Sequence, residues 1–132
     1  MKKYLFLGVI FTAFSVCAAN SEKLIQTQTH WNQQPIQPIH IDHPQVSMLR
    51  ITIPVGEKLA MHKHPVLNIG YLTKGELTVR SDKGEKLVMK AGDPIVELID
   101  TWHYGENTGS EDAEIVVTYV GEKGNDLSII KD

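Results

Sequence analysis

Short stretches in which hydrophobic and polar residues alternate recur along much of this 132-residue chain. The alternation is clearest in residues 49–53, 67–71 and 76–80, and its period of two is typical of strands with one buried face. Turns that contain glycine separate these stretches, and the turn at Asp82–Gly84 predicts a hairpin. No stretch after the first twenty residues sustains a helical period. The pattern therefore predicts an all-β fold, either an antiparallel sandwich or a small barrel.

The first nineteen residues differ in character from the rest of the chain. Two lysines at positions 2–3 precede a nearly uninterrupted apolar run over residues 5–16, and small residues follow it. This order predicts a secretory signal peptide that is cleaved after Ala18 or Ala19, and hence a periplasmic or secreted protein without membrane contact after cleavage. The apolar run is short for a membrane-spanning anchor. Acylation of Cys17, as in a lipoprotein, is disfavoured by the valine that precedes it.

Removal of residues 1–19 leaves a chain of 113 residues from Asn20 to Asp132. The loss of two lysines changes the formal net charge from −3 to −5, and the only cysteine is lost with them. A chain without cysteine has no disulfide framework and no thiol nucleophile. An acidic chain is a poor candidate for binding nucleic acid.

Residues 20–45 are polar and contain three prolines, so we expect an extended arm with at most a short edge strand near residues 36–41. Residues 46–132 carry the strand pattern and are expected to form the barrel. An arm of this kind can pair with the edge of a second copy, which makes a homodimer an expectation as well.

Two histidines, His62 and His64, are the first residues that indicate chemistry. Residues two apart in an extended segment project from the same face, so both imidazoles would point in one direction. Neutral imidazole nitrogen is a good ligand for Zn, Cu, Ni and Fe. By itself the pair is more typical of two histidines on an exposed loop than of a metal site.

A second segment changes the weight of this pair. Each of the two segments has five residues at fixed spacings. In the first they are Gly56, His62, His64, Asn68 and Gly75, and in the second they are Gly92, Leu98, Asp100, His103 and Asn107. In order and spacing the two segments resemble the two motifs of the cupin family, and they cover about half of the mature chain.

The resemblance implies a double-stranded β-helix, or jelly-roll barrel. It also implies a divalent transition metal (Fe, Mn, Ni or Zn) bound inside that barrel by His62, His64 and His103. The first cupin motif usually has a glutamate where this chain has Asn68. Asn68 is therefore either a fourth ligand, through a neutral carbonyl oxygen, or a hydrogen-bond partner of a water bound to the metal. Glu97 would replace the missing carboxylate only if its strand were bulged. Leu98 and Asp100 stand where the second motif usually has proline and glycine.

The remaining candidates have weaker support. Asp100 is a candidate carboxylate partner that would orient His103. Three aromatic residues beside the motifs either line the pocket or belong to the core; they are Tyr71, Trp102 and Tyr104. Three histidines share no spacing with the other three and are expected to be exposed; they are His30, His40 and His43.

The sequence leaves two classes of function open. The first is a metal-dependent enzyme that acts on a small, anionic or bidentate oxygen molecule, as a dioxygenase with iron or as a hydrolase, lyase or isomerase with a Lewis-acid metal. The second is a non-catalytic cupin that binds a small ligand or the metal itself. Motifs for phosphate-binding loops, dinucleotide binding and serine nucleophiles are absent from the sequence.

Overall fold

The computed structural model describes residues 19–132, and the predicted signal peptide, including Cys17, lies almost entirely outside them. Within this part of the chain there are nine strands and no helix, and hence no helix long and apolar enough to cross a membrane. The strands are β1 (Pro44–Ile53), β2 (His62–Lys63), β3 (Leu67–Lys74), β4 (Glu76–Ser81), β5 (Lys86–Lys90), β6 (Pro94–Val96), β7 (His103–Glu106), β8 (Ala113–Glu122) and β9 (Ile129–Ile130). The prediction of an all-β chain is confirmed.

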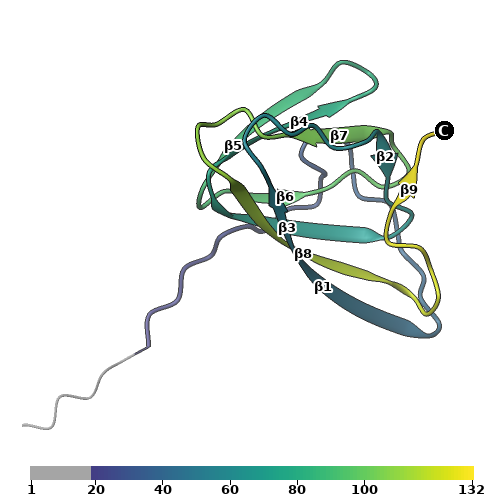
Figure 1. Cartoon of the computed structure of the whole chain (residues 1–132). Coiled ribbons are helices and arrows are strands. Elements are labelled where there is room, and N and C mark those ends of the chain that lie inside the picture. The colour runs from purple at the N-terminus through teal and green to yellow at the C-terminus, as the bar shows by residue number, and fades with distance from the viewer. Residues whose placement is uncertain (1–18) are drawn as a thin grey trace, which may run out of the picture.

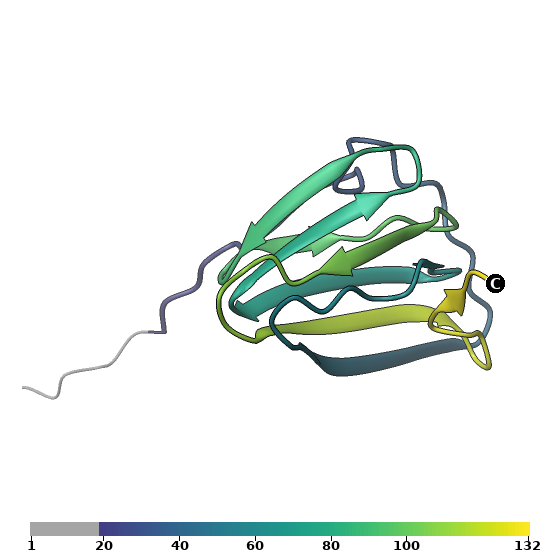
Figure 2. The same cartoon turned by 45° about the horizontal axis from the view of Figure 1, so that its top comes forward.

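The strands form two sheets that face each other, as Figure 1 and the tilted view in Figure 2 show. One sheet has the order β1-β8-β3-β6, and the other has the order β5-β4-β7-β2-β9. Every pairing between these strands is antiparallel. Strands adjacent in the sheets are mostly distant in sequence, which is the arrangement of a jelly-roll barrel. The space between the two sheets holds the core.

The predicted hairpin at Asp82–Gly84 is present between β4 and β5. The backbone N–H of Ser81 donates to the carbonyl of Glu85 at 3.1 Å, and Gly84 has a φ of 87°. A positive φ of this kind is costly for residues with a Cβ, so glycine suits this position. In the sequence, this hairpin lies between the two cupin-like motifs.

The inner face of the four-stranded sheet is built in rows that run across β8, β3 and β6. One row consists of Val117, Gly70 and Ile95, which pair directly across the three strands and are all buried. A Cβ at Gly70 would lie 2.8 Å from Ile95 Cγ2 and 2.9 Å from Ile115 Cδ1. Glycine at this position therefore allows two isoleucine side chains to fill the centre of the barrel.

The arm that precedes β1 packs partly on its own barrel. The N–H of Trp31 donates to the carbonyl of Val96 at 3.0 Å, and an isolated bridge joins Thr29 to Pro35. Residues 36–41 form no strand, so the arm lacks the short edge strand that the sequence allowed there. The homodimer stays a prediction.

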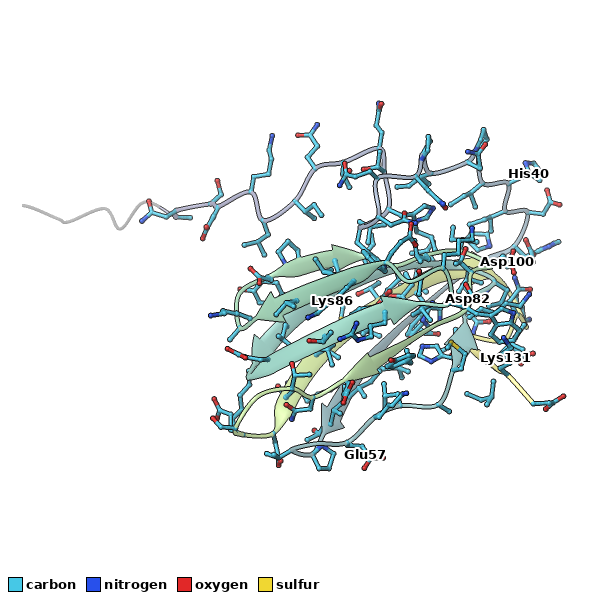
Figure 3. All side chains as sticks on the ribbon, turned by 90° about the horizontal axis from the view of Figure 1, so that it is seen from above. His40, Glu57, Asp82, Lys86, Asp100 and Lys131 are labelled. Carbon is cyan, nitrogen blue, oxygen red and sulfur yellow. The ribbon has the colours of Figure 1, made fainter. Side chains whose placement is uncertain are left out.

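The expectation that three histidines are exposed is wrong for one of them. His30 is buried, with an exposed fraction of 7%, because its ring Nδ1 hydrogen-bonds the backbone carbonyl of Glu97 at 2.6 Å. His40 and His43 are exposed, and Figure 3 shows His40 on the arm, away from the barrel. The arm is thus anchored at His30 beside the end of β6, the strand that precedes His103.

Candidate metal centre

The three motif histidines meet at one end of the barrel interior. His62 in β2 pairs directly with His103 at the start of β7, and His64 follows two residues after His62. The ring centroids are 4.6 to 5.0 Å apart, and one potential ligand nitrogen from each ring lies within 4.8 Å of the others. His64 and His103 are buried and His62 is partly exposed, so the cluster is reached from the side of His62.

The same ring nitrogen of each histidine is occupied by a backbone carbonyl. Nδ1 lies 2.8 Å from the carbonyl oxygen of Ala60 for His62, 2.7 Å from that of Leu127 for His64, and 2.7 Å from that of Thr101 for His103. A carbonyl accepts only, so each Nδ1 carries the proton and donates it. Each Nε2 is left with its lone pair, which is the arrangement that supporting hydrogen bonds impose on metal-binding histidines.

Burial keeps these imidazoles neutral. Removal from water lowers the pKa of His64 to about 4, and the same cause lowers the pKa of His62 and of His103. A metal binds the neutral ring, so the three histidines compete little with protons near pH 7. The three neutral imidazoles can therefore bind a cation near pH 7 without first losing a proton.

The four-stranded sheet faces this cluster with a row of polar residues. Tyr119 in β8 pairs with Asn68 in β3, and the N–H of Glu97 donates to the carbonyl of Asn68 at 3.0 Å. All three are buried, with exposed fractions of 4%, 2% and 9%, and all three line the same small cavity as the histidines. The site thus lies between the sheets, with the histidines on one side and this row, Tyr119–Asn68–Glu97, on the other.

The expectation that Glu97 needs a bulge to face inward is wrong. Ile69 pairs with Val96 and Gly70 with Ile95, and the hydrogen bond from Glu97 to Asn68 continues that register without interruption. Glu97 has the same parity as the buried Ile95, and side chains of equal parity share a face. The parity was visible in the sequence, but the inward direction of Ile95 was not.

Several polar atoms of this centre have no hydrogen-bond partner. They include Oδ1 of Asn68, Oε2 of Glu97 and Nε2 of His103, and the last two are 3.5 Å apart. Burial raises the pKa of Glu97 to about 7. Buried polar atoms without partners are rare and costly, so their gathering in one place indicates a site built for a bound group. A divalent metal fits the donor set.

The cavity among these residues is small. Its volume is about 50 Å³, and its other walls are apolar side chains, including Ile53, Val79 and Val117. A buried water needs roughly 10–15 Å³ and a drug-sized ligand roughly 300–1,000 Å³. The space therefore suits an ion with a few waters or with a ligand of a few heavy atoms.

The C-terminal segment supports the site in a way that the motifs did not indicate. Leu127 provides the carbonyl that orients His64, and β9 pairs with β2, where Ile130 lies opposite His62. Tyr119 was missed as well, although its alternation with Ala113, Ile115 and Val117 marks it as inward-facing. Its ring stands edge-on to His64, with centroids 5.6 Å apart.

Asp100 does not orient His103. Its side chain is 63% exposed and lies 3.4 Å from the ammonium of Lys63, and Figure 3 shows it at the outer rim of the barrel. Nδ1 of His103 is held by the carbonyl of Thr101 instead. Asp100 has a φ of 50°, which explains why the corresponding position of the second motif usually has glycine.

The aromatic residues beside the motifs belong neither to the cavity nor to the buried core. Tyr71, Trp102 and Tyr104 are all partly exposed. The Lys58 ammonium lies 4.1 Å from the ring centroid of Tyr104, and that of Lys63 lies 5.4 Å from the ring of Trp102. Aromatic faces attract cations, so Tyr104 and Trp102 take part in surface contacts with lysine and not in the site.

The chain is similar to several proteins of known structure. It aligns with a recombinant oxalate oxidase in complex with glycolate at 28% identity and a TM-score of 0.56, covering 64% of this chain and 45% of that one. A predicted oxalate decarboxylase from Thermotoga maritima aligns at 30% identity with a TM-score of 0.50, covering 55% of this chain and 64% of that one. An RmlC-like cupin from Shewanella frigidimarina shares the fold at 20% identity and a TM-score of 0.52, with coverages of 60% and 68%.

The chain spans less than half of the length of the oxalate oxidase. No curated protein sequence matches it. The profile of the Cupin domain family matches residues 49–119, which contain both histidine segments and the polar row. Together with the jelly-roll topology and the three-histidine cluster, this match shows that the chain belongs to the cupin family.

Proposed function

We propose that this protein is an exported cupin that holds a divalent transition metal on His62, His64 and His103 and uses it to bind and transform a small bidentate oxygen compound. A two-carbon carboxylate, such as oxalate or a 2-hydroxy acid, is the class that suits the site best. The alternative outcome is a protein that binds such a compound without transforming it.

One observation carries this proposal. The three histidines present their unprotonated Nε2 atoms to a common cavity, and each ring is oriented by a backbone carbonyl. Such an arrangement costs free energy, since it buries polar atoms and leaves Nε2 of His103 without a partner. A bound metal would offset that cost.

The size of the cavity supports a small ligand. About 50 Å³ leaves room for little more than an ion and a few ligand atoms, while Asn68 and Tyr119 offer an amide and a phenol on the opposite wall. Two structural relatives point to the same class of compound: one is an oxalate oxidase in complex with glycolate, and the other is a predicted oxalate decarboxylase.

A divalent metal in this site would supply a Lewis acid that binds and polarises the oxygens of the ligand. The chain itself would supply neutral ligand nitrogens, the polar row on the facing sheet and apolar walls that exclude bulk water. With iron, reaction with oxygen in the manner of a dioxygenase is the form of catalysis to test first.

The test begins with protein that has been expressed with residues 1–19 and recovered from the exported fraction. N-terminal sequencing checks cleavage after Ala18 or Ala19, and elemental analysis identifies the metal. Titrations of the Mn(II)-loaded protein then compare oxalate and glycolate with acetate, which offers a single carboxylate, and with succinate, which is longer. We expect the two-carbon bidentate ligands to change the electron paramagnetic resonance spectrum and to bind about tenfold more tightly, roughly 1.4 kcal/mol.

Equal binding of all four acids, or no spectral change with any of them, would overturn the choice of ligand class. Oxygen consumption and product formation with the iron and manganese forms then separate an enzyme from a binding protein. His40→Ala changes an exposed histidine outside the cluster, and its metal content controls for the effects of substitution and purification.

A further inference from the structure

Asn68, which stands where cupins usually have a glutamate, has a glutamate as its direct neighbour on the next strand segment. The register of β3 and β6 pairs Ile69 with Val96 and Gly70 with Ile95, so the next pair is Asn68 and Glu97. Their backbones are joined by a hydrogen bond of 3.0 Å from the N–H of Glu97 to the carbonyl of Asn68. Residues that lie opposite each other in an antiparallel pair project from the same face, with Cβ atoms about 4.5–5.5 Å apart.

We propose that Glu97 provides the carboxylate ligand of the metal, so that the negative charge missing at Asn68 is supplied from the strand opposite. The proposal rests on the metal centre described under the proposed function, but it does not depend on the identity of the ligand or on any reaction. It assigns to Glu97 a role that the motif positions do not indicate.

The contact between Glu97 and His103 supports this assignment. Oε2 of Glu97 lies 3.5 Å from Nε2 of His103, and neither atom has a hydrogen-bond partner. Because the proton of His103 sits on Nδ1, where it is donated to the carbonyl of Thr101, the two facing atoms both carry lone pairs. Two acceptors face each other favourably only when a cation lies near both or when the carboxyl group carries a proton.

The spacing of these two atoms matches shared coordination. Ligand nitrogen and oxygen atoms lie about 2.1 Å from a zinc ion, and two such atoms at a tetrahedral angle are about 3.4 Å apart. The Glu97–His103 distance of 3.5 Å is close to that value. Neither side chain would need to move far to bind one ion.

Charge favours the same assignment. Three neutral histidines and a neutral asparagine would leave the full double charge of the ion in a low-dielectric cavity. A carboxylate from Glu97 would reduce that charge by one, as the glutamate of the usual motif does. The surrounding cavity contains no other acidic side chain among the residues that the structure describes.

His30 positions the segment that carries Glu97. Its buried ring hydrogen-bonds the carbonyl of Glu97 at 2.6 Å, and the neighbouring Trp31 N–H donates to Val96 at 3.0 Å. These two bonds hold the end of β6 between the arm and β3. The side chain of Glu97 is thereby kept in the cavity, although the strand itself ends at Val96.

The decisive test compares Glu97→Gln with the double variant Asn68→Glu/Glu97→Gln, which returns the carboxylate to position 68. Affinities for Zn(II) and Co(II) are measured by competition with a chelator, and the visible spectrum of the Co(II) form reports its ligands. We expect Glu97→Gln to weaken binding at least tenfold and to change the Co(II) spectrum. The double variant should return the affinity to within about threefold of the wild type.

Glu57→Gln serves as the control, because Glu57 is exposed and does not line the cavity of the cluster. The inference is overturned if Glu97→Gln keeps both the affinity and the Co(II) spectrum, since Glu97 then only donates a hydrogen bond to His103. If that variant fails to fold, the double variant decides. Affinity equal to the wild type supports exchange of one carboxylate for another, whereas a change of tenfold or more in either direction rejects it.

Failure of this inference can be told apart from failure of the proposed function. If the wild type binds no metal, the metal centre itself is refuted. If Glu97→Gln binds metal with the affinity and the Co(II) spectrum of the wild type, the metal centre remains and only the role of Glu97 is rejected.

Discussion

Two neighbouring rows of residues on the inner face of the same sheet differ in what they contribute: one packs the core and the other faces the metal centre. Both rows cross β8 and β3. The first, Tyr119–Asn68–Glu97, ends at the residue that directly follows β6, and the second, Val117–Gly70–Ile95, ends within β6, two residues away along each segment. The second row is apolar and closely packed around Gly70. The first contains a buried amide oxygen and a buried carboxylate oxygen that lack partners.

Residues that stabilise the fold and residues that form the candidate site are thus only two positions apart along the same strands. Apolar burial of the second kind contributes roughly 25 cal/mol per Å² of surface removed from water. Each buried polar atom without a partner costs about 1–3 kcal/mol. The polar row and the histidines therefore reduce the stability of the metal-free protein, and the apolar rows beyond them compensate.

The largest expected effect is on metal binding, from His103→Ala. The change removes the buried ring that lies nearest to both His62 and Glu97, so affinity for a divalent metal should fall by more than about 100-fold. Elemental analysis after dialysis measures it, with His40→Ala as the control. Equal metal content in both variants and the wild type would refute the cluster as a metal centre.

The next effect tests the apolar part of the barrel. Leu72 is completely buried in the row beyond Gly70, where it pairs with Ile115, and Leu72→Ala should lower the free energy of unfolding by about 2–5 kcal/mol. Metal affinity should stay within about threefold of the wild type. Urea unfolding of the metal-free protein measures the loss.

Leu24→Ala makes the same chemical change at a side chain that is 49% exposed, and it should cost less than about 1 kcal/mol. If Leu72→Ala weakened metal binding as strongly as it weakens folding, the two ends of the barrel would not be independent, and the contrast drawn between the rows would be wrong.

The smallest expected effect concerns pH and the metal-free protein. Burial raises the pKa of Glu97 from 4.5 to about 7, so above pH 4.5 the unfolded chain releases a proton that the folded chain retains. Stability from this group is therefore lost as the pH rises from about 4.5 through 7. Burial lowers the pKa of His64 from 6.5 to about 4, so stability is also lost as the pH falls from 6.5 towards 4.

Glu97→Gln should remove only the loss on the alkaline side. Urea unfolding at pH 5 and pH 8, with a chelator present, measures the difference for the variant and the wild type. Stability that changes by the same amount in both proteins between these two pH values would contradict the raised pKa of Glu97.

The sequence predicted the fold class and the histidine cluster because both depend on local spacing. Alternation with a period of two reports which side chains share a face, and His62 and His64 share one for that reason. The match of two motifs to the cupin family then supplied His103. Glu97 was misjudged because its direction depends on the register between β3 and β6, which no local pattern expresses.

Other supporting residues were missed for a related reason. His30 is buried by a hydrogen bond to a residue 67 positions away, and His64 is oriented by the carbonyl of Leu127, 63 positions away. Both interactions connect parts of the chain that have no spacing in common with the motifs. Their effect on the site is visible only when the sheets are assembled.

By itself the sequence determined that the chain forms short, half-buried strands, and its resemblance to the cupin motifs assigned three histidines to one site. Side-chain direction along a strand is a local property, and the motif spacings preserve it. The tertiary structure alone decided that Tyr119, Asn68 and Glu97 form one row opposite those histidines. The register between distant strands is set by the packing of the whole barrel, so the partners of the site were decided by that packing.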